Sequence, residues 1–99
     1  MTGLDTNVLL RYFLQDDPAQ SKAANRVISQ LGRLNRGFIT TVVLCELNWS
    51  LRKAYKLSKA DRLTIIADVL STDELDIENE DLCRQALLAA RTGSADFAD

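Results

Sequence analysis

Acidic side chains at three places in this 99-residue sequence have the spacing and chemistry of a metal-dependent site. Asp5 follows a short apolar opening, and Glu46 lies in the most apolar stretch of the chain. Asp96 and Asp99 stand three residues apart at the end. Carboxylates that converge in one crevice form an oxygen-rich site suited to Mg²⁺ or Mn²⁺. An ion held there generates hydroxide from water and stabilises the charge that develops on a reacting phosphate.

The composition excludes several other kinds of active site. The chain has no histidine, so it cannot form a Ser-His-Asp triad, a histidine acid–base pair or a histidine-rich zinc site. Cys45 and Cys83 are too few for a four-cysteine zinc site and lack Cys-x-x-Cys spacing. Two unpaired thiols in apolar contexts favour a reducing cytoplasm over a disulfide. Chemistry based on carboxylates and a metal ion needs no histidine and agrees with this composition.

Each acid also has an ordinary structural interpretation, which the sequence leaves open. Asp5 can cap the helix expected to follow it. Glu46 can point outward in a polar stripe that continues through Ser50 to Lys53. Asp96 and Asp99 suit the start of a helix, where the helix dipole favours negative charge.

The pattern of apolar residues predicts three strands and several helices. The strands are expected at residues 1–4, 37–40 and 74–77, and the helices at residues 6–14, 18–31, 41–55, 59–70 and 80–92. Strands that alternate with helices predict an α/β fold with a central, mainly parallel sheet flanked by helices. Ligands of such sheets bind beyond the carboxyl ends of the strands, which is where Asp5 is expected.

Capping residues support these boundaries. Asp17 is expected to cap the helix that begins at Pro18, and Ser58 and Asn79 to cap two later helices. Gly93 is expected to end the last of these, and Ser94 to begin a further helix that runs to the end of the chain. No repeat, linker or low-complexity segment interrupts the sequence. Residues 1–99 are therefore expected to form a single domain.

Three segments together resemble the motifs of PIN domains, in the order in which those domains carry them. They are Gly3–Leu10 (GLDTNVLL), Thr41–Leu47 (TVVLCEL) and Ala95–Asp99 (ADFAD). The resemblance covers almost the whole chain. It implies a PIN-like α/β fold and a Mg²⁺- or Mn²⁺-dependent endoribonuclease, usually the VapC toxin of a VapBC toxin–antitoxin pair.

The resemblance also implies a role for each acid. Asp5, Glu46 and Asp99 match the catalytic, metal-binding acids, Asp96 matches an auxiliary acid, and Thr6 resembles a hydroxyl residue that supports the metal or its water. PIN domains continue beyond the third motif with the rest of a helix, further strands and another helix. We therefore expect a PIN-like fold that is truncated at its C-terminal side, has little nuclease activity and associates with other chains.

The charge distribution bears on RNA binding. Twelve basic and fourteen acidic residues give a net charge of −2, so contacts with RNA must come from local groups of basic residues or from metal ions. Arg11, Arg52, Lys53 and Lys56 lie nearest to the expected site and are predicted to contact phosphates.

Apolar residues in excess of a small core suggest protein partners. Some of Leu10, Phe13, Leu14 and Trp49 are expected to be exposed, for a homodimer or for a helix of a cognate antitoxin, whereas burial in the core is the alternative for each of them. No apolar run approaches the about 18 residues of a membrane span, and no signal peptide is evident. The sequence thus predicts a cytoplasmic protein with RNA and protein partners and no membrane association.

Two other functions remain possible at this stage. Asp5-Thr6-Asn7 after a first strand faintly resembles the nucleophile motif of aspartate-based phosphatases, although Asn7 occupies the position of their second acid. The chain is alternatively a non-catalytic PIN-like module that binds a partner. Divalent-metal binding separates the nuclease from the binding module, and a trapped acyl-phosphate would identify the phosphatase.

Overall fold

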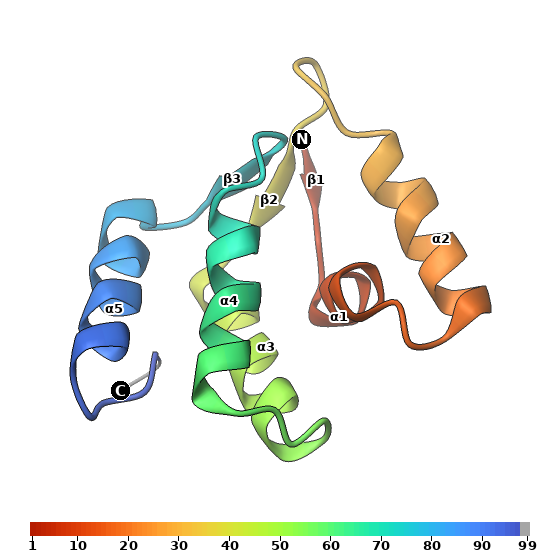
Figure 1. The fold of residues 1–99 in the computed structure, drawn as a ribbon. Helices are drawn as coiled ribbons and strands as arrows, with labels where there is room; N and C mark the ends of the chain where they lie inside the picture. The colour runs from red at the N-terminus through yellow and green to blue at the C-terminus, as the bar shows by residue number, and fades with distance from the viewer. Residues whose placement is uncertain (98–99) are drawn as a thin grey trace.

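The computed structural model describes residues 1–97, which form a parallel sheet flanked by helices (Figure 1). This confirms the predicted α/β architecture. In chain order the elements are β1 (Thr2–Gly3), α1 (Thr6–Leu14), α2 (Pro18–Ser29), β2 (Gly37–Ile39), α3 (Thr41–Lys53), α4 (Lys59–Leu70), β3 (Leu75–Ile77) and α5 (Glu80–Thr92).

The sheet has the order β1-β2-β3, with both pairs parallel. Gly37 lies at its centre, opposite Thr2 on one side and Leu75 on the other. A Cβ atom on Gly37 would lie 2.7 Å from Cδ2 of Leu75 and 2.9 Å from Cδ1 of Leu31. These distances are shorter than van der Waals contact, so the side chains close over the strand only because this residue is glycine.

The helices form a continuous row beneath the sheet. Helix α3 packs against α1 and α4, α2 packs against α1, and α5 packs against α4. Figure 1 shows α3 and α4 in the middle of the molecule, with α1 and α2 on one side and α5 on the other. Helix α3 is therefore the element that links the two sides.

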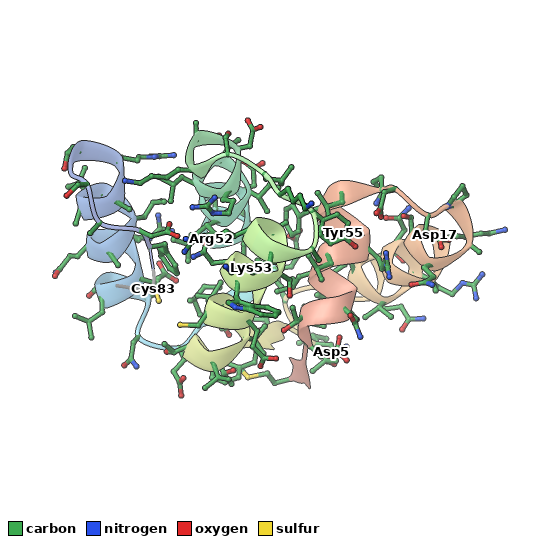
Figure 2. The ribbon with its side chains drawn as sticks, turned by 90° about the horizontal axis from the view of Figure 1, so that it is seen from below. Asp5, Asp17, Arg52, Lys53, Tyr55 and Cys83 are labelled. Atoms are coloured by element: carbon green, nitrogen blue, oxygen red, sulfur yellow. The ribbon has the colours of Figure 1, made fainter. Side chains whose placement is uncertain are left out.

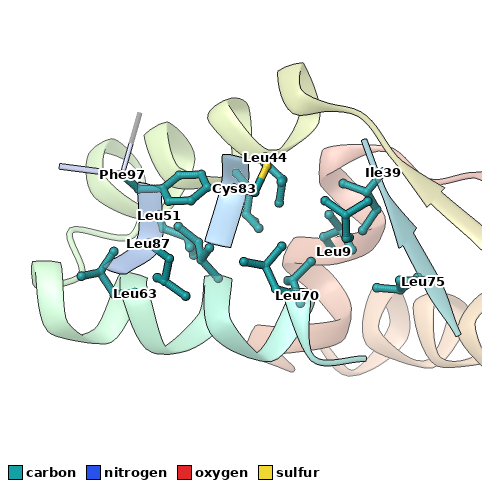
Figure 3. Packing of buried hydrophobic residues seen from close by; sticks show 14 of the residues in the cluster. Leu9, Ile39, Leu44, Leu51, Leu63, Leu70, Leu75, Cys83, Leu87 and Phe97 are labelled. Carbon is teal, nitrogen blue, oxygen red and sulfur yellow. The ribbon is translucent and has the colours of Figure 1, made fainter. Parts of the chain in front are cut away.

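The core forms where α3 meets its neighbours (Figure 3). Leu44, Leu47 and Leu51 are fully buried and repeat at helical spacing along one face of α3. Leu9 of α1 and Ile66 of α4 are buried with them. This packing fixes the rotation of α3 about its axis, and hence the direction of its opposite face.

Several capping predictions are confirmed. Oδ1 of Asp17 accepts a 3.1 Å hydrogen bond from the amide of Gln20, and Oγ of Ser58 accepts one of the same length from the amide of Asp61. Both bonds satisfy amides that the first turn of a helix leaves unpaired.

Two other predicted helix starts agree with the structure only in part. Asn79 is the N-cap residue of α5, but it adopts a left-handed conformation (φ 53°) and its side chain makes no capping hydrogen bond. Residues 94–97 form an irregular segment, and residues 98 and 99 of the helix predicted after Ser94 lie outside the described residues. Tertiary contacts of Asp96, described below, hold that segment in place.

No helix among residues 1–97 combines the length and apolar character needed to cross a bilayer.

Candidate functional site

Asp5 both caps α1 and faces solvent. Its backbone is extended (φ −95°, ψ 171°), and its Oδ1 accepts a 3.0 Å hydrogen bond from the amide of Val8. The side chain is exposed, and within residues 1–97 its second oxygen accepts no hydrogen bond. The cap thus fixes the orientation of the carboxylate at the carboxyl end of β1, and it leaves one oxygen available for a ligand.

Glu46 lies on the exposed face of α3, away from the buried leucines. It makes no hydrogen bond or salt bridge with any residue between 1 and 97. Glu46 therefore has the outward orientation that the sequence left open. Its availability comes from the leucine face, which orients α3.

The structure brings Asp5, Thr6 and Glu46 together. They line one surface depression of about 280 Å³, whose remaining walls are Asn7, Val43 and Ser50. Asp5, Thr6 and Asn7 come from the start of α1, and the others from one face of α3. Packing of α1 against α3 therefore converts two distant sequence motifs into one polar pocket.

The residues of this depression fit a hard divalent cation. Asp5 and Glu46 supply carboxylates and Thr6 a hydroxyl, whereas no sulfur or imidazole lines the pocket. Mg²⁺ is commonly bound through one or two carboxylates, with waters or substrate phosphates completing its octahedron. No group of three acids, histidines or cysteines among residues 1–97 meets the geometry of a metal site. Asp99, the predicted third acid, lies outside the described residues.

Asp96 occupies a different environment from Asp5 and Glu46. Its Oδ2 accepts a 3.0 Å hydrogen bond from Nη2 of Arg62 and a 3.4 Å hydrogen bond from Nδ2 of Asn48. Arg62 also donates to Oδ1 of Asn48 at 3.2 Å and to the carbonyl of Leu57 at 2.8 Å. The side chains of Arg62 and Asp96 are only 8% and 16% exposed. Asp96 therefore joins the C-terminal segment to α3 and α4.

The electrostatics of Asp96 follow from these contacts. Burial disfavours its charged form, but hydrogen bonds from the amide of Phe97 and from Arg62 and Asn48 outweigh that effect and lower its pKa. The carboxylate is thus held in its ionised form. Sequence analysis missed both Asn48 and Arg62, although each is a polar residue among the apolar positions of its helix, which is a signal of a buried polar partner.

Of the four basic residues predicted to contact phosphates, Arg11 is held in the fold, and Arg52, Lys53 and Lys56 are exposed to solvent. Arg11 donates a 3.2 Å hydrogen bond to the hydroxyl of Tyr55 and lies 3.5 Å from a carboxylate oxygen of Asp16. Arg52 and Lys53 are exposed on α3 and form no salt bridge within residues 1–97 (Figure 2). Arg52 and Lys53 are therefore better placed than Arg11 to meet a phosphate.

The expectation of exposed apolar residues holds for Trp49 only. Leu10 is buried at 6% exposure and belongs to the core beneath α1. Phe13 and Leu14 are half-buried and pack against that core. Trp49 is 62% exposed.

Comparison with known proteins agrees with these motifs. The sequence matches the PIN domain family over residues 3–99, which include both the Asp5 and the Glu46 motif. No curated protein and no solved structure gives a significant match. Since the match extends over nearly the entire sequence, the chain belongs to the PIN domain family, whose fold is of nuclease type.

Proposed function

We propose that this chain is the catalytic part of a metal-dependent endoribonuclease, the toxin of a type II toxin–antitoxin system of the VapC kind. The observation that carries the proposal is the depression in which Asp5, Thr6 and Glu46 meet. These residues belong to two motifs typical of PIN domains, and their oxygen atoms suit Mg²⁺ or Mn²⁺.

A bound divalent ion would supply a hydroxide nucleophile and stabilise negative charge on the phosphate. Asp5, at the start of α1, and Glu46, on α3, would hold the ion, and Asp99 is proposed as the third acid. The hydroxyl of Thr6 would support the ion or its water. Asp96 acts as an auxiliary residue, because its contacts with Arg62 and Asn48 position the chain that leads to Asp99.

The proposed partners are RNA, a cognate antitoxin and a second copy of the chain, in the cytoplasm. Exposed cations Arg52 and Lys53 support binding to phosphates. Large apolar side chains on the surface, including Val42, Leu82 and Leu88, support protein contacts. The free thiols Cys45 and Cys83 support a reducing compartment.

The decisive experiment compares two aspartates that have the same structural role. Asp5 and Asp17 each cap a helix through Oδ1, at α1 and α2 respectively, but only Asp5 lines the depression (Figure 2). Asparagine keeps the capping oxygen and removes the charge. Asp5→Asn should abolish RNA cleavage in Mg²⁺ or Mn²⁺, whereas Asp17→Asn should retain it.

Controls separate loss of chemistry from loss of fold. Both variants should keep the circular dichroism spectrum of the parent chain, and a chelator should stop cleavage by the parent and by Asp17→Asn. Equal cleavage by the two variants would exclude Asp5 as a metal ligand. Absence of both metal binding and cleavage in the parent would favour a non-catalytic module.

A further inference from the structure

An aromatic ring and two cations lie next to the acidic depression on α3. Trp49 is one helical turn beyond Glu46, and Lys53 is one turn beyond Trp49. Residues three or four apart on a helix are surface neighbours, with Cβ atoms about 5–6 Å apart. Arg52 precedes Lys53 in the same turn, three residues beyond Trp49. We call Trp49, Arg52 and Lys53 the α3 patch.

The ring of Trp49 is available for contact. Whereas Leu47 and Leu51 on the opposite face of α3 are fully buried, Trp49 is 62% exposed. The two cations of the patch have no acidic partner within residues 1–97, although the chain as a whole carries a net charge of −2. Excess positive charge around an open aromatic ring attracts an anionic, planar ligand.

We propose that Trp49 is a stacking platform for an unpaired base of RNA, next to the phosphate that a divalent ion held by Asp5 and Glu46 would bind. Arg52 and Lys53 bind the phosphates on either side of that nucleotide. This inference rests on the proposed nuclease function and adds to it a preference for single-stranded regions. A duplex satisfies the stacking of its own bases, so it cannot present a base face to Trp49 without unpairing.

The charges of the patch favour RNA over a second copy of the chain. A two-fold contact centred on Trp49 would place Arg52 and Lys53 of one copy near the same residues of the other. The repulsion between these cations opposes such a dimer, particularly when a metal neutralises Glu46. A polyanion experiences no such repulsion.

The sequence contains a single tryptophan, so its fluorescence reports on Trp49 alone. The metal-free chain is titrated with single-stranded oligouridylate, with an RNA duplex of equal length and with an abasic ribose–phosphate oligomer. Oligouridylate should quench the fluorescence, and the other two should not. Equal quenching by the abasic oligomer would overturn the proposal, because that ligand has no base to stack.

Substitution provides a second measurement. Trp49→Leu should lower the affinity for labelled oligouridylate about 10- to 100-fold, and Trp49→Phe should retain part of it. Leu34→Ala is the control, because Leu34 is fully exposed in the loop before β2, and it should bind normally. Unchanged affinity of Trp49→Leu would overturn the proposal. So would a dimer of the RNA-free chain, seen by sedimentation, that Trp49→Leu converts to a monomer.

The outcome also separates this inference from the proposed function. If the parent cleaves RNA and Trp49→Leu binds normally, the stacking proposal fails and the nuclease proposal stands. If oligouridylate quenches Trp49 but no metal supports cleavage, the nuclease proposal fails and the stacking contact stands.

Discussion

Arg62 and Asp96 form a salt bridge of 3.0 Å between Nη2 and Oδ2, although 34 positions separate them in the sequence. Both side chains are largely buried, and Asn48 bonds to both. Buried ions are tolerated when their hydrogen bonds are satisfied, and removal of one partner leaves the other uncompensated. The pair therefore holds the segment that precedes Asp99 against α3 and α4.

Substitution of Asp96 should destabilise the fold. Asp96→Ala leaves the guanidinium of Arg62 without its carboxylate, and we expect a loss of about 3 kcal/mol in the free energy of unfolding by urea. Asp68→Ala is the control, because Asp68 is an exposed acid on the same helix as Arg62, and it should change that free energy by less than about 0.5 kcal/mol. Similar losses in both variants would show that the salt bridge contributes no specific stability.

The lowered pKa of Asp96 predicts a dependence of stability on pH. A carboxyl whose pKa is lower in the folded than in the unfolded chain stabilises the fold fully above its unfolded value of about 3.9. That contribution falls as the pH drops through the lower, folded value. The difference in Tm between the parent and Asp96→Asn should thus be largest near neutral pH and shrink below about pH 4. A difference that stays constant down to pH 2 would contradict the assignment.

Glu46 should affect stability in the opposite direction when no metal is present. Asp5 and Glu46 are like charges on one depression, so Glu46→Gln should raise the metal-free stability by about 0.5 kcal/mol. The same change should weaken binding of Mn²⁺ in calorimetric titration. Glu74→Gln removes an exposed acid outside the depression and should do neither. Unchanged stability and metal affinity of Glu46→Gln would support the alternative that Glu46 is an ordinary surface residue in a polar stripe with Ser50 and Lys53.

The exposed cations of α3 should set the salt dependence of RNA binding. Arg52→Gln and Lys53→Gln should each weaken binding across different sequences and reduce the slope of log K against log salt by about 0.7. Lys22→Gln, on the exposed side of α2, should leave that slope unchanged. If all three variants change the slope equally, RNA binding depends on the total charge of the chain and not on the exposed cations of α3.

Much of the fold could be predicted because local signals agreed with the tertiary structure. Alternating apolar segments located the three strands, and Asp17 with Pro18 located the start of α2. The order of motifs also placed Asp5 and Glu46 on a common site. Such features depend on spacing along the chain, which the sequence displays directly.

The features that the sequence did not reveal are tertiary contacts. Asp96 has the local pattern of a helix start, but its carboxylate also accepts hydrogen bonds from Arg62 and Asn48 on other helices. The sequence left the exposure of Leu10 open, and only the packing of α1 shows that it is buried. The rotation and packing of the helices decide which residues contact one another between helices. The spacing of residues along the sequence does not reveal these contacts.

The order of the strands in the sheet has a consequence for biosynthesis. Each strand pairs with the next one in the chain, so β2 completes the backbone contacts of β1 as soon as it is made. Chains fold from the N-terminus during translation, and α3 follows β2 directly. Asp5 and Glu46 can therefore come together once α4 has covered the leucine face of α3. The acidic pocket therefore takes none of its lining residues from α5.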